Sequence, residues 1–279
     1  EYGIPPIKAI QMASLNTAEY FKIQNLGAIA PGYKADFIVL PDLKEFSPEL
    51  VFKNGELVAN HGHLVGEIKN KGVTGVRNSV NVKWIKYDDF KLEAKSDEVH
   101  AIQLIPKQLI TKNIVSKIKV VDGYAESNVD NDTLKICVLE RHRAGGNIGK
   151  GFVKGFNLKS GAIASTVAHD SHNMIVIGTN DNDMYTAAVA LIKSHGGKIV
   201  VNNGEIIAHL PLPVAGLISD KDAQYVIEKG EELNNATRKL GCTVEDPFMA
   251  MGFLSLPVIP ELKITDKGIG NGVSIIIMI

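Results

Sequence analysis

The chain has 279 residues, enough for one or two domains with a sizeable hydrophobic core. Hydrophobic residues make up 45% of it and charged residues 22%, the composition of an ordinary globular protein. The formal net charge of −1 gives no electrostatic reason to expect a nucleic acid or an anionic membrane as partner, and no stretch reaches the roughly 18 apolar residues of a membrane-spanning helix.

Residues 1–22 are expected to be helical. The pair Pro5-Pro6 suits a helix start, and Asn16 and Thr17 are candidate caps of a second short helix. The apolar face of this segment predicts self-association, because an exposed apolar patch promotes contact between copies.

Residues 27–66 predict a small β unit. A short strand is expected over 37–40, and the sequence VFKNGELVA at 51–59 is typical of a hairpin. Its central Asn54-Gly55 pair predicts a type I′ turn.

The segment 67–95 is polar and weakly periodic, with Trp84 as its single large anchor. It is interpreted as a linker, so that the chain divides into residues 1–66, the linker and a second unit over 96–279. Apolar runs in the second unit predict strands over 99–105, 114–121, 134–139, 162–168, 174–178 and 198–201.

Capping residues predict two helices in the second unit. Asn180 is a candidate cap with Asp183 at the third helical position, and this helix is expected to run to His195. The strands on either side make it a candidate βαβ unit. Ser219 with Asp222 is expected to open the other helix. Between the two helices, VVNNGEIIA predicts a second hairpin with an Asn-Gly turn.

Both cysteines and both chain ends bear on the origin of the chain. Cys137 and Cys242 are far apart and predict buried free thiols, which favours a cytoplasmic protein. The chain opens on Glu1 without a signal peptide and closes on the apolar run VSIIIMI. We expect a fragment or a processed chain, with either a buried strand or a replaced native end after Gly268.

The sequence AHDSHN at 168–173 carries the densest cluster of titratable groups. His169, Asp170 and His172 lie between two apolar runs, and such side chains can bind a metal or move a proton near neutral pH. The same residues also fit a polar turn in which Asp170 accepts hydrogen bonds from nearby backbone. The residues alone leave both interpretations open.

Two other motifs come close to known sites. His61 and His63 have the spacing of an HxH metal pair, but they follow the first predicted hairpin, and a solvated loop is favoured. Arg141 and His142 precede a glycine-rich loop that departs from the phosphate-binding pattern, since Ala144 stands where that pattern needs glycine. This loop is interpreted as a structural turn with a substrate-side or interdomain role.

Three segments together carry a family resemblance. The first is AIQMASLNTAEYF followed by LGAIAPGYKADFIVLPDL; the second runs from ERHRAGGNIGKG to AHDSHNMIVIGTNDNDM; the third joins GGKIVVNNGEIIAHLPLPVAGLISD with DPFMAMGFLSLPVIPELKITDKG. The first resembles the last barrel helix and small β-sandwich of an amidohydrolase. The other two resemble the extra C-terminal domain of adenine deaminases. The resemblance implies an α+β chain: the end of an amidohydrolase barrel and a β-sandwich segment, followed by a mixed α/β C-terminal domain.

The resemblance also implies a reaction, the hydrolysis of adenine to hypoxanthine and ammonia in purine salvage, at a binuclear manganese or iron centre. In such enzymes the metal ligands and the catalytic aspartate lie on barrel strands that would precede residue 1, so none is carried onto this chain, which we expect to be inactive alone. The missing barrel, adenine and further copies of the chain are the expected partners.

The C-terminal signature maps onto six residues that we expect to face the active site and help close it: Arg141, His142, His169, Asp170, His172 and Asn173. Two alternatives stay open. One is a non-catalytic interaction or assembly module, and the other is part of another amidohydrolase that acts on cyclic amidines or amides.

Overall fold

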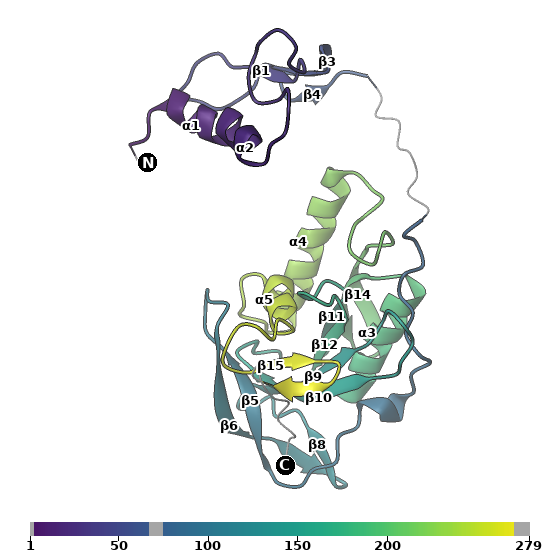
Figure 1. The fold of residues 1–279 in the computed structure, drawn as a ribbon. Coiled ribbons are helices and arrows are strands. Elements are labelled where there is room, and N and C mark those ends of the chain that lie inside the picture. The colour runs from purple at the N-terminus through teal and green to yellow at the C-terminus, as the bar shows by residue number, and fades with distance from the viewer. Residues whose placement is uncertain (1–2, 67–74, 271–279) are drawn as a thin grey trace. The chain divides into compact units, whose positions relative to one another are not determined.

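The computed structural model describes residues 3–66 and 75–270 (Figure 1). The chain forms two compact units, Glu1–Lys71 and Gly72–Ile279. The expected mixture of helices and strands is confirmed. Within the described ranges, no helix is long and apolar enough to cross a membrane. The expectation for the VSIIIMI run falls on residues outside these ranges.

The smaller unit joins two short helices to a four-stranded antiparallel sheet. Helix α1 spans Pro6–Ala13 and α2 spans Leu15–Tyr20. The sheet has the order β1-β2-β3-β4, with bounds Phe37–Val39, Leu50–Lys53, Glu56–Asn60 and His63–Leu64. The predicted hairpin is confirmed, since Asn54 and Gly55 join β2 to β3 with φ angles of 51° and 83°.

The cap predicted for the second helix is wrong. Ser14 occupies the cap position of α2, so Asn16 and Thr17 lie inside the helix. Pro6 is the first residue of α1, as the sequence predicts. Among residues 3–66 only Ala18 is buried, and large apolar side chains such as Tyr20 and Ile29 are 80% and 85% exposed. This unit therefore has little core of its own.

The larger unit is built on an eight-stranded sheet with the order β14-β13-β11-β12-β9-β10-β5-β6. All neighbouring strands are antiparallel except β5 and β10. The strand bounds are Glu98–Leu104 for β5, Thr111–Lys117 for β6, Thr133–Leu139 for β9, Ile148–Lys154 for β10, Ala162–Ser165 for β11, Met174–Gly178 for β12, Gly197–Asn202 for β13 and Glu205–Pro211 for β14. Every residue of β9, β11 and β12 is buried, so the core lies on the middle of the sheet.

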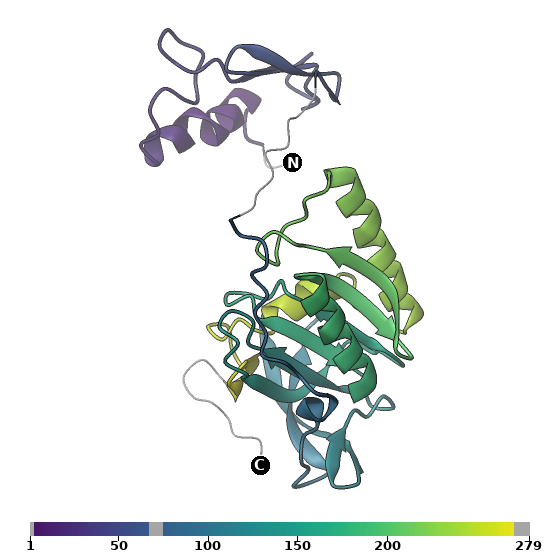
Figure 2. The ribbon, with the colours of Figure 1, turned by 90° about the vertical axis from the view of Figure 1, so that its right-hand side faces the viewer.

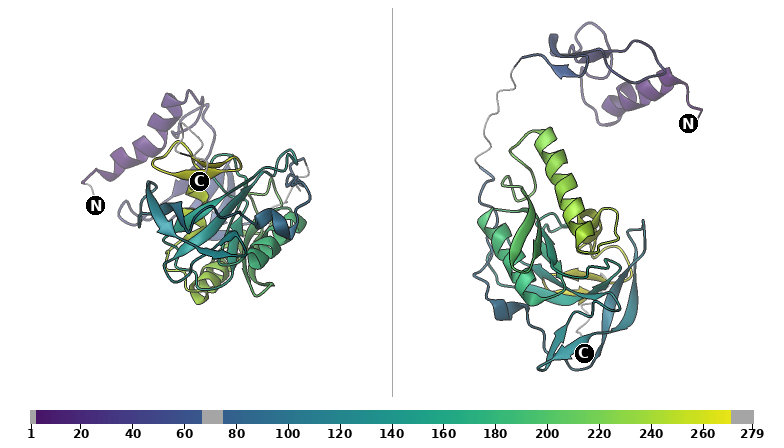
Figure 3. Two further views of the ribbon diagram at one scale, coloured as in Figure 1. Left: turned by 90° about the horizontal axis from the view of Figure 1, so that it is seen from below. Right: turned by 180° about the vertical axis from the view of Figure 1, so that it is seen from behind.

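Helices cover both faces of this sheet (Figure 2, Figure 3). Helix α3, Asp181–Lys193, shares one core with Ile199 and Val201 of β13. Helices α4, Ala223–Lys239, and α5, Pro247–Phe253, share the other core with Val200. Because successive side chains of a strand point to opposite faces, α3 lies on one side and α4 with α5 on the other. Two small hairpins complete the unit: β7 (Lys119–Val121) with β8 (Tyr124–Glu126), and β15 (Lys263–Thr265) with β16 (Gly268–Gly270).

Local signals predict α3 and α4 well. The side chain of Asn180 caps α3 by accepting from the Asp183 N–H at 2.9 Å, and Asp222 caps α4 by accepting from the Tyr225 N–H at 2.8 Å. Two details differ: α3 ends at Lys193 rather than His195, and Ser219 is not the cap of α4. The strands β12 and β13 run parallel as in a βαβ unit, but β11 lies between them.

The predicted strand over 114–121 is two strands, β6 and β7, and neither β10 nor α5 was expected. The anchor role predicted for Trp84 is wrong, because this side chain is 84% exposed. Its neighbours Val80, Ile85 and Phe90 are buried instead, the last in the 3-10 turn η1, Tyr87–Phe90. Residues 75–95 thus pack on the larger unit.

Candidate functional site

Two loops of the larger unit meet at neighbouring strand ends, and together they hold all six candidate residues. We call residues 140–147, between β9 and β10, and residues 166–173, between β11 and β12, the signature loops. They lie side by side because β9 pairs with β12, with Leu139 opposite Met174. Helix α5 also holds the second loop in place, since the His169 N–H donates to the Gly252 carbonyl at 2.9 Å.

Glu140 shapes the first signature loop. Its carboxylate accepts from the backbone N–H groups of His142, Arg143 and Gly145 at 2.5, 2.8 and 2.7 Å. Partial burial acts to raise the pKa of Glu140, but these three hydrogen bonds outweigh it and leave the pKa below its usual 4.5. The loop is therefore folded around a carboxylate of its own, with no anion needed to order it.

Arg141 is a buried cation that joins three segments, with a relative exposure of 1%. Its guanidinium donates to the carbonyl of His172, to that of Ser79 at 3.2 Å and to that of Ala215 at 3.1 Å. Burial lowers its pKa, although a guanidinium stays charged in proteins. Since its donors are engaged by carbonyl oxygens, Arg141 orders the second signature loop rather than offering its charge to a ligand.

His142 and Asn173 add two further ties between the signature loops. The Nε2 of His142 lies 2.6 Å from the Ser171 carbonyl, which requires a proton on that nitrogen. The Asn173 side chain accepts from the Arg141 N–H at 3.3 Å and donates to Asp266 at 3.2 Å. Asp266 comes from the turn between β15 and β16 and also accepts from Asn147 of the first loop at 3.2 Å. His142 and Asn173 thus serve the geometry of the site.

His169 and His172 are the pair best suited to chemistry. Their ring centroids are 5.5 Å apart, and the ring of His169 also packs on Phe253 of α5 at 4.6 Å. The Nδ1 of His172 accepts from the Ala168 N–H at 3.3 Å, so its proton resides on Nε2. Asp170 beside them is exposed.

The electrostatic surroundings favour a neutral His172. Burial is the main cause that lowers its pKa below 6.5, and the charges of His169 and Arg141 act in the same direction, while Asp170 opposes them. The ring nitrogens of His169 make no hydrogen bond within the described part of the chain. The pair therefore presents one neutral N–H donor and one half-buried imidazole that can accept or donate a proton.

The remaining candidates, His61 and His63, lie in the smaller unit. Both are exposed, and the Nδ1 of His61 lies 2.9 Å from the side-chain oxygen of Asn60. Over residues 3–66 and 75–270, no three His, Cys, Asp or Glu side chains come close enough together to hold a metal ion. The described residues therefore do not fit a metal centre.

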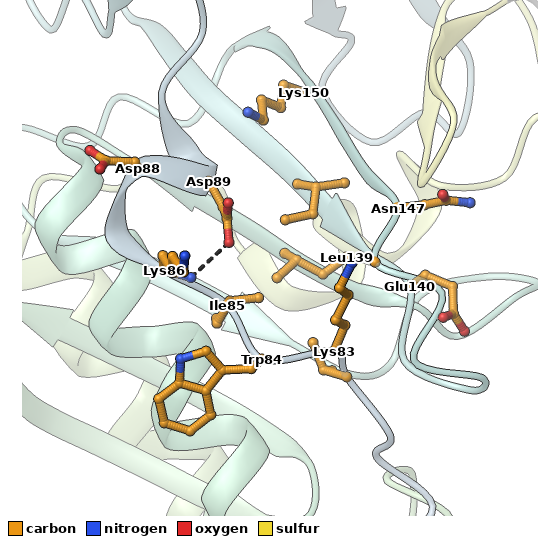
Figure 4. Close-up of a pocket in the computed structure, with 13 residues that line it drawn as sticks. Lys83, Trp84, Ile85, Lys86, Asp88, Asp89, Leu139, Glu140, Asn147 and Lys150 are labelled. Carbon is orange, nitrogen blue, oxygen red and sulfur yellow. Dashed lines mark hydrogen bonds between the residues drawn. The ribbon is translucent and has the colours of Figure 1, made fainter.

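A groove of about 480 Å³ borders the first signature loop (Figure 4). Its lining mixes Lys83, Lys86 and Lys150 with Asp88 and Asp89 and includes Glu140. Several of these groups are already engaged: Lys150 donates to the Lys91 carbonyl at 2.7 Å, and Asp89 accepts from the Lys86 N–H at 2.7 Å. The mixed charges point to no particular ligand.

Sequence reasoning missed Glu140, Asp266 and the support from α5. A carboxylate directly before a glycine-rich turn is a usable signal for Glu140, because such turns leave several N–H groups facing one way. Nothing local marks Asp266, which is 93 residues from Asn173.

Comparisons with known proteins agree on the family. Residues 108–274 match the family model described as the adenine deaminase C-terminal domain, and residues 1–58 match that of the amidohydrolase family. Proteins named adenine deaminase from Dehalococcoides mccartyi and Methanothrix thermoacetophila are 45% and 44% identical over 267 and 270 residues, which is 96% of this chain and 47% of each relative. Adenine deaminase 2 of Carboxydothermus hydrogenoformans is 46% identical over 261 residues, 93% of this chain and 46% of that protein.

The chain spans about half the length of the curated relatives it matches. Its match to the C-terminal domain model covers the whole eight-stranded sheet except β5, and it includes both signature loops. The protein therefore belongs to the adenine deaminase C-terminal domain family.

Proposed function

We propose that this chain is the C-terminal part of a metal-dependent adenine deaminase, which converts adenine and water to hypoxanthine and ammonia. The observation that carries the proposal is the match of residues 108–274 to the adenine deaminase C-terminal domain, together with 45% identity to a named adenine deaminase across 96% of the chain. The amidohydrolase match over residues 1–58 supports a hydrolase of that superfamily. A place in purine salvage in the cytoplasm completes the proposal.

The division of labour follows from what these residues offer. Residues 1–66 are proposed to be the last barrel helix and part of a small β-sandwich, and residues 96–279 the C-terminal domain. The segment 75–95, expected from the sequence to belong to a linker, packs on that domain instead. A binuclear manganese or iron centre is proposed to be held by the part of the relatives that this chain does not cover. When bound there, such a centre supplies a hydroxide at neutral pH.

The second signature loop is proposed to border the adenine site of the complete enzyme. His172 carries an N–H donor and His169 an imidazole with free nitrogens, and both kinds of group suit the ring nitrogens of a purine. Arg141, His142 and Asn173 would hold that loop in place, and Asp170 would stay at its exposed edge.

A complementation experiment tests the proposed activity. The chain alone, with added manganese, is expected to release no ammonia from adenine. Co-produced with the remaining half of the Dehalococcoides mccartyi relative, it is expected to give hypoxanthine and ammonia in equal amounts. A stable complex without any deamination would favour a non-catalytic assembly module instead. Turnover of a cyclic amide but not of adenine would favour a different amidohydrolase.

The role of the signature loop has its own test in the complemented enzyme. His169→Ala is expected to lower turnover of adenine at least about tenfold, a loss of roughly 1.4 kcal/mol in transition-state stabilisation, while the metal content stays unchanged. His100→Ala, at an exposed histidine on β5, is the matched control and should leave turnover unchanged. Normal turnover by His169→Ala would contradict the role proposed for the loop without touching the proposed reaction.

A further inference from the structure

The strand β14 is an unusually open edge of the larger sheet. It is the last strand in the sheet order, so among the described residues β13 is its one neighbour. Ile206 and Ile207 are the second and third of its seven residues and are 51% and 40% exposed. Exposed, apolar edge strands offer free N–H and C=O groups to another strand.

The opposite edge shows how this sheet avoids such pairing. The strand β6 carries Lys112, Lys117 and three further polar residues along its seven positions. Lysines on an edge strand discourage pairing with a second sheet, because each would have to lose its water. The strand β14 carries no lysine.

Helix α4 lies beside β14, and its exposed face changes charge along its length. Glu228, Glu231 and Glu232 precede Asn235 on this face, and Arg238 and Lys239 follow it at the end of the helix. A groove of about 710 Å³ runs between this face and Ile207. Within the described residues, Glu232 already pairs with Lys229 and Arg238 donates to Asn235, whereas Glu231 and Lys239 have no ion pair.

We propose that β14 and α4 form an isologous interface, in which β14 of one copy pairs antiparallel with β14 of a second copy and the two sheets become continuous. In a two-fold contact each surface meets itself in reverse. With the axis at Ile207, Glu205 lies opposite His209 of the second copy. With the axis passing Asn235, Glu231 lies opposite Lys239, and Glu232 opposite Arg238.

A single axis can serve both pairings. Ile207, the centre of the strand pairing, and Asn235, the centre of the charge reversal, line the same groove. The strand and the helix are therefore self-complementary about one axis, which argues for a second copy of this chain over an unrelated partner. On the face of the sheet that carries α3, Val189, Ala190 and Ile206 line a mainly apolar groove. In the proposed dimer this groove lies next to the same groove of the second copy.

The strand pairing is tested by the association state of the whole chain, measured by sedimentation equilibrium. Wild type is expected to be a dimer, and Ile207→Asp to raise the dimer dissociation constant at least about tenfold, because the change acts on both sides of a two-fold contact. Val115→Asp is the matched control: Val115 is 60% exposed on the other edge strand, β6, and its replacement should leave the constant unchanged. A thermal melt shows whether each variant is folded.

The charge pairing is tested by exchanging the two charges. Lys239→Glu is expected to weaken the dimer, and adding Glu231→Lys in the same chain should restore most of the lost affinity, since the pair then has the opposite sense. Lys112→Glu on β6 controls for the change in net charge. Three results would each overturn the proposal. The wild type could be a monomer, Ile207→Asp could leave the dimer dissociation constant unchanged, or the double variant could dimerise no more tightly than Lys239→Glu. If Ile207→Asp leaves the dimer unchanged, the exposed apolar side chains of α1 and α2 become the next candidate for the contact.

Discussion

At the scale of single residues, Arg141 stands out because a buried charge is balanced by carbonyl oxygens. Its three acceptors come from segments 31, 62 and 74 residues away in the sequence. A lysine at this position keeps the charge but has one compact ammonium group, which cannot reach three divergent carbonyls. The guanidinium therefore fixes the relative position of three loops.

Arg141→Lys is expected to lower the free energy of unfolding of the larger unit by about 2–4 kcal/mol, since at least two buried carbonyl groups lose their donors. Urea unfolding followed by circular dichroism measures the loss. Arg143→Lys is the matched control, because Arg143 is exposed, and it should change the value by less than about 0.5 kcal/mol. Equal stabilities for the two variants would show that the hydrogen bonds of Arg141 contribute little to the stability of the larger unit.

His172 gives the site a pH dependence. Its pKa in the folded protein is lowered below 6.5 by burial and then by electrostatic interactions with His169 and Arg141. Just below pH 6.5, His172 therefore binds a proton in the unfolded chain but not in the folded chain. Its contribution to the free energy of unfolding is fully present above this pH and is lost as the pH drops toward the folded pKa.

His172→Asn removes this titration and suits the backbone, because His172 has a φ of 50° and asparagine tolerates that conformation. The stability of the variant is expected to fall less steeply below pH 6.5 than that of the wild type. Some slope should remain, since burial also lowers the pKa of His209. Urea unfolding at a series of pH values measures both slopes, and parallel curves would contradict the assignment to His172.

At the scale of elements, the hairpin of β13 and β14 depends on the start of α3. The buried carboxylate of Asp183 accepts from the Gly204 N–H at 2.6 Å, the Asn203 N–H at 3.3 Å and the Asn180 side chain at 2.8 Å. One side chain thus serves the helix cap and the hairpin turn together.

Asp183→Ala is expected to destabilise the larger unit by about 3 kcal/mol, because two turn N–H groups lose a charged acceptor. Asp222→Ala is the comparison at the cap of α4, where one exposed hydrogen bond is lost and about 1 kcal/mol is expected. Chemical denaturation of the two variants measures the difference. A similar loss at both sites would mean that the contacts of Asp183 with the turn contribute little.

The elements also explain what the sequence can and cannot predict. The helix cap at Asn180 and the two Asn-Gly turns depend on contacts between residues a few positions apart. The sequence therefore predicts them correctly. The strand β10 was missed because Gly149 and Gly151 belong to a glycine-rich run that was interpreted as a structural turn. In the structure a side chain on Gly149 would meet the Thr265 carbonyl and one on Gly151 would meet Ile269, so both glycines make room for the β15–β16 hairpin. No local rule reveals a partner more than a hundred residues away.

The candidate site follows the same division. The titratable cluster at 168–173 and the basic residues Arg141 and His142 are visible in the sequence, and the structure brings them together. Their roles are not visible, because the acceptors of Arg141 at Ser79 and Ala215, and the partner of Asn173 at Asp266, depend on the sheet order. The sequence therefore identifies the two loops of the candidate site. Only the fold shows which residues hold these loops in place and which two histidines can contact a ligand.

At the scale of the whole molecule, the two units differ sharply in core. Residues 3–66 bury only Ala18, whereas every residue of β9, β11 and β12 in the larger unit is buried. Burial of apolar side chains is the main favourable contribution to folding, so stability should be unevenly shared between the units.

Native-state hydrogen exchange measures this difference directly. Amides of β1, β2 and β3 are expected to exchange through local opening at a cost far below global unfolding, while those of β9, β11 and β12 exchange only when the larger unit unfolds. Adding the remaining half of a relative should slow exchange in β1 to β3 if the smaller unit completes a larger fold, as its amidohydrolase match supports. Slow exchange in β1 to β3 of the chain alone would mean that the smaller unit is stable although it buries so few residues. The physical argument for the proposed barrel neighbour would then fail.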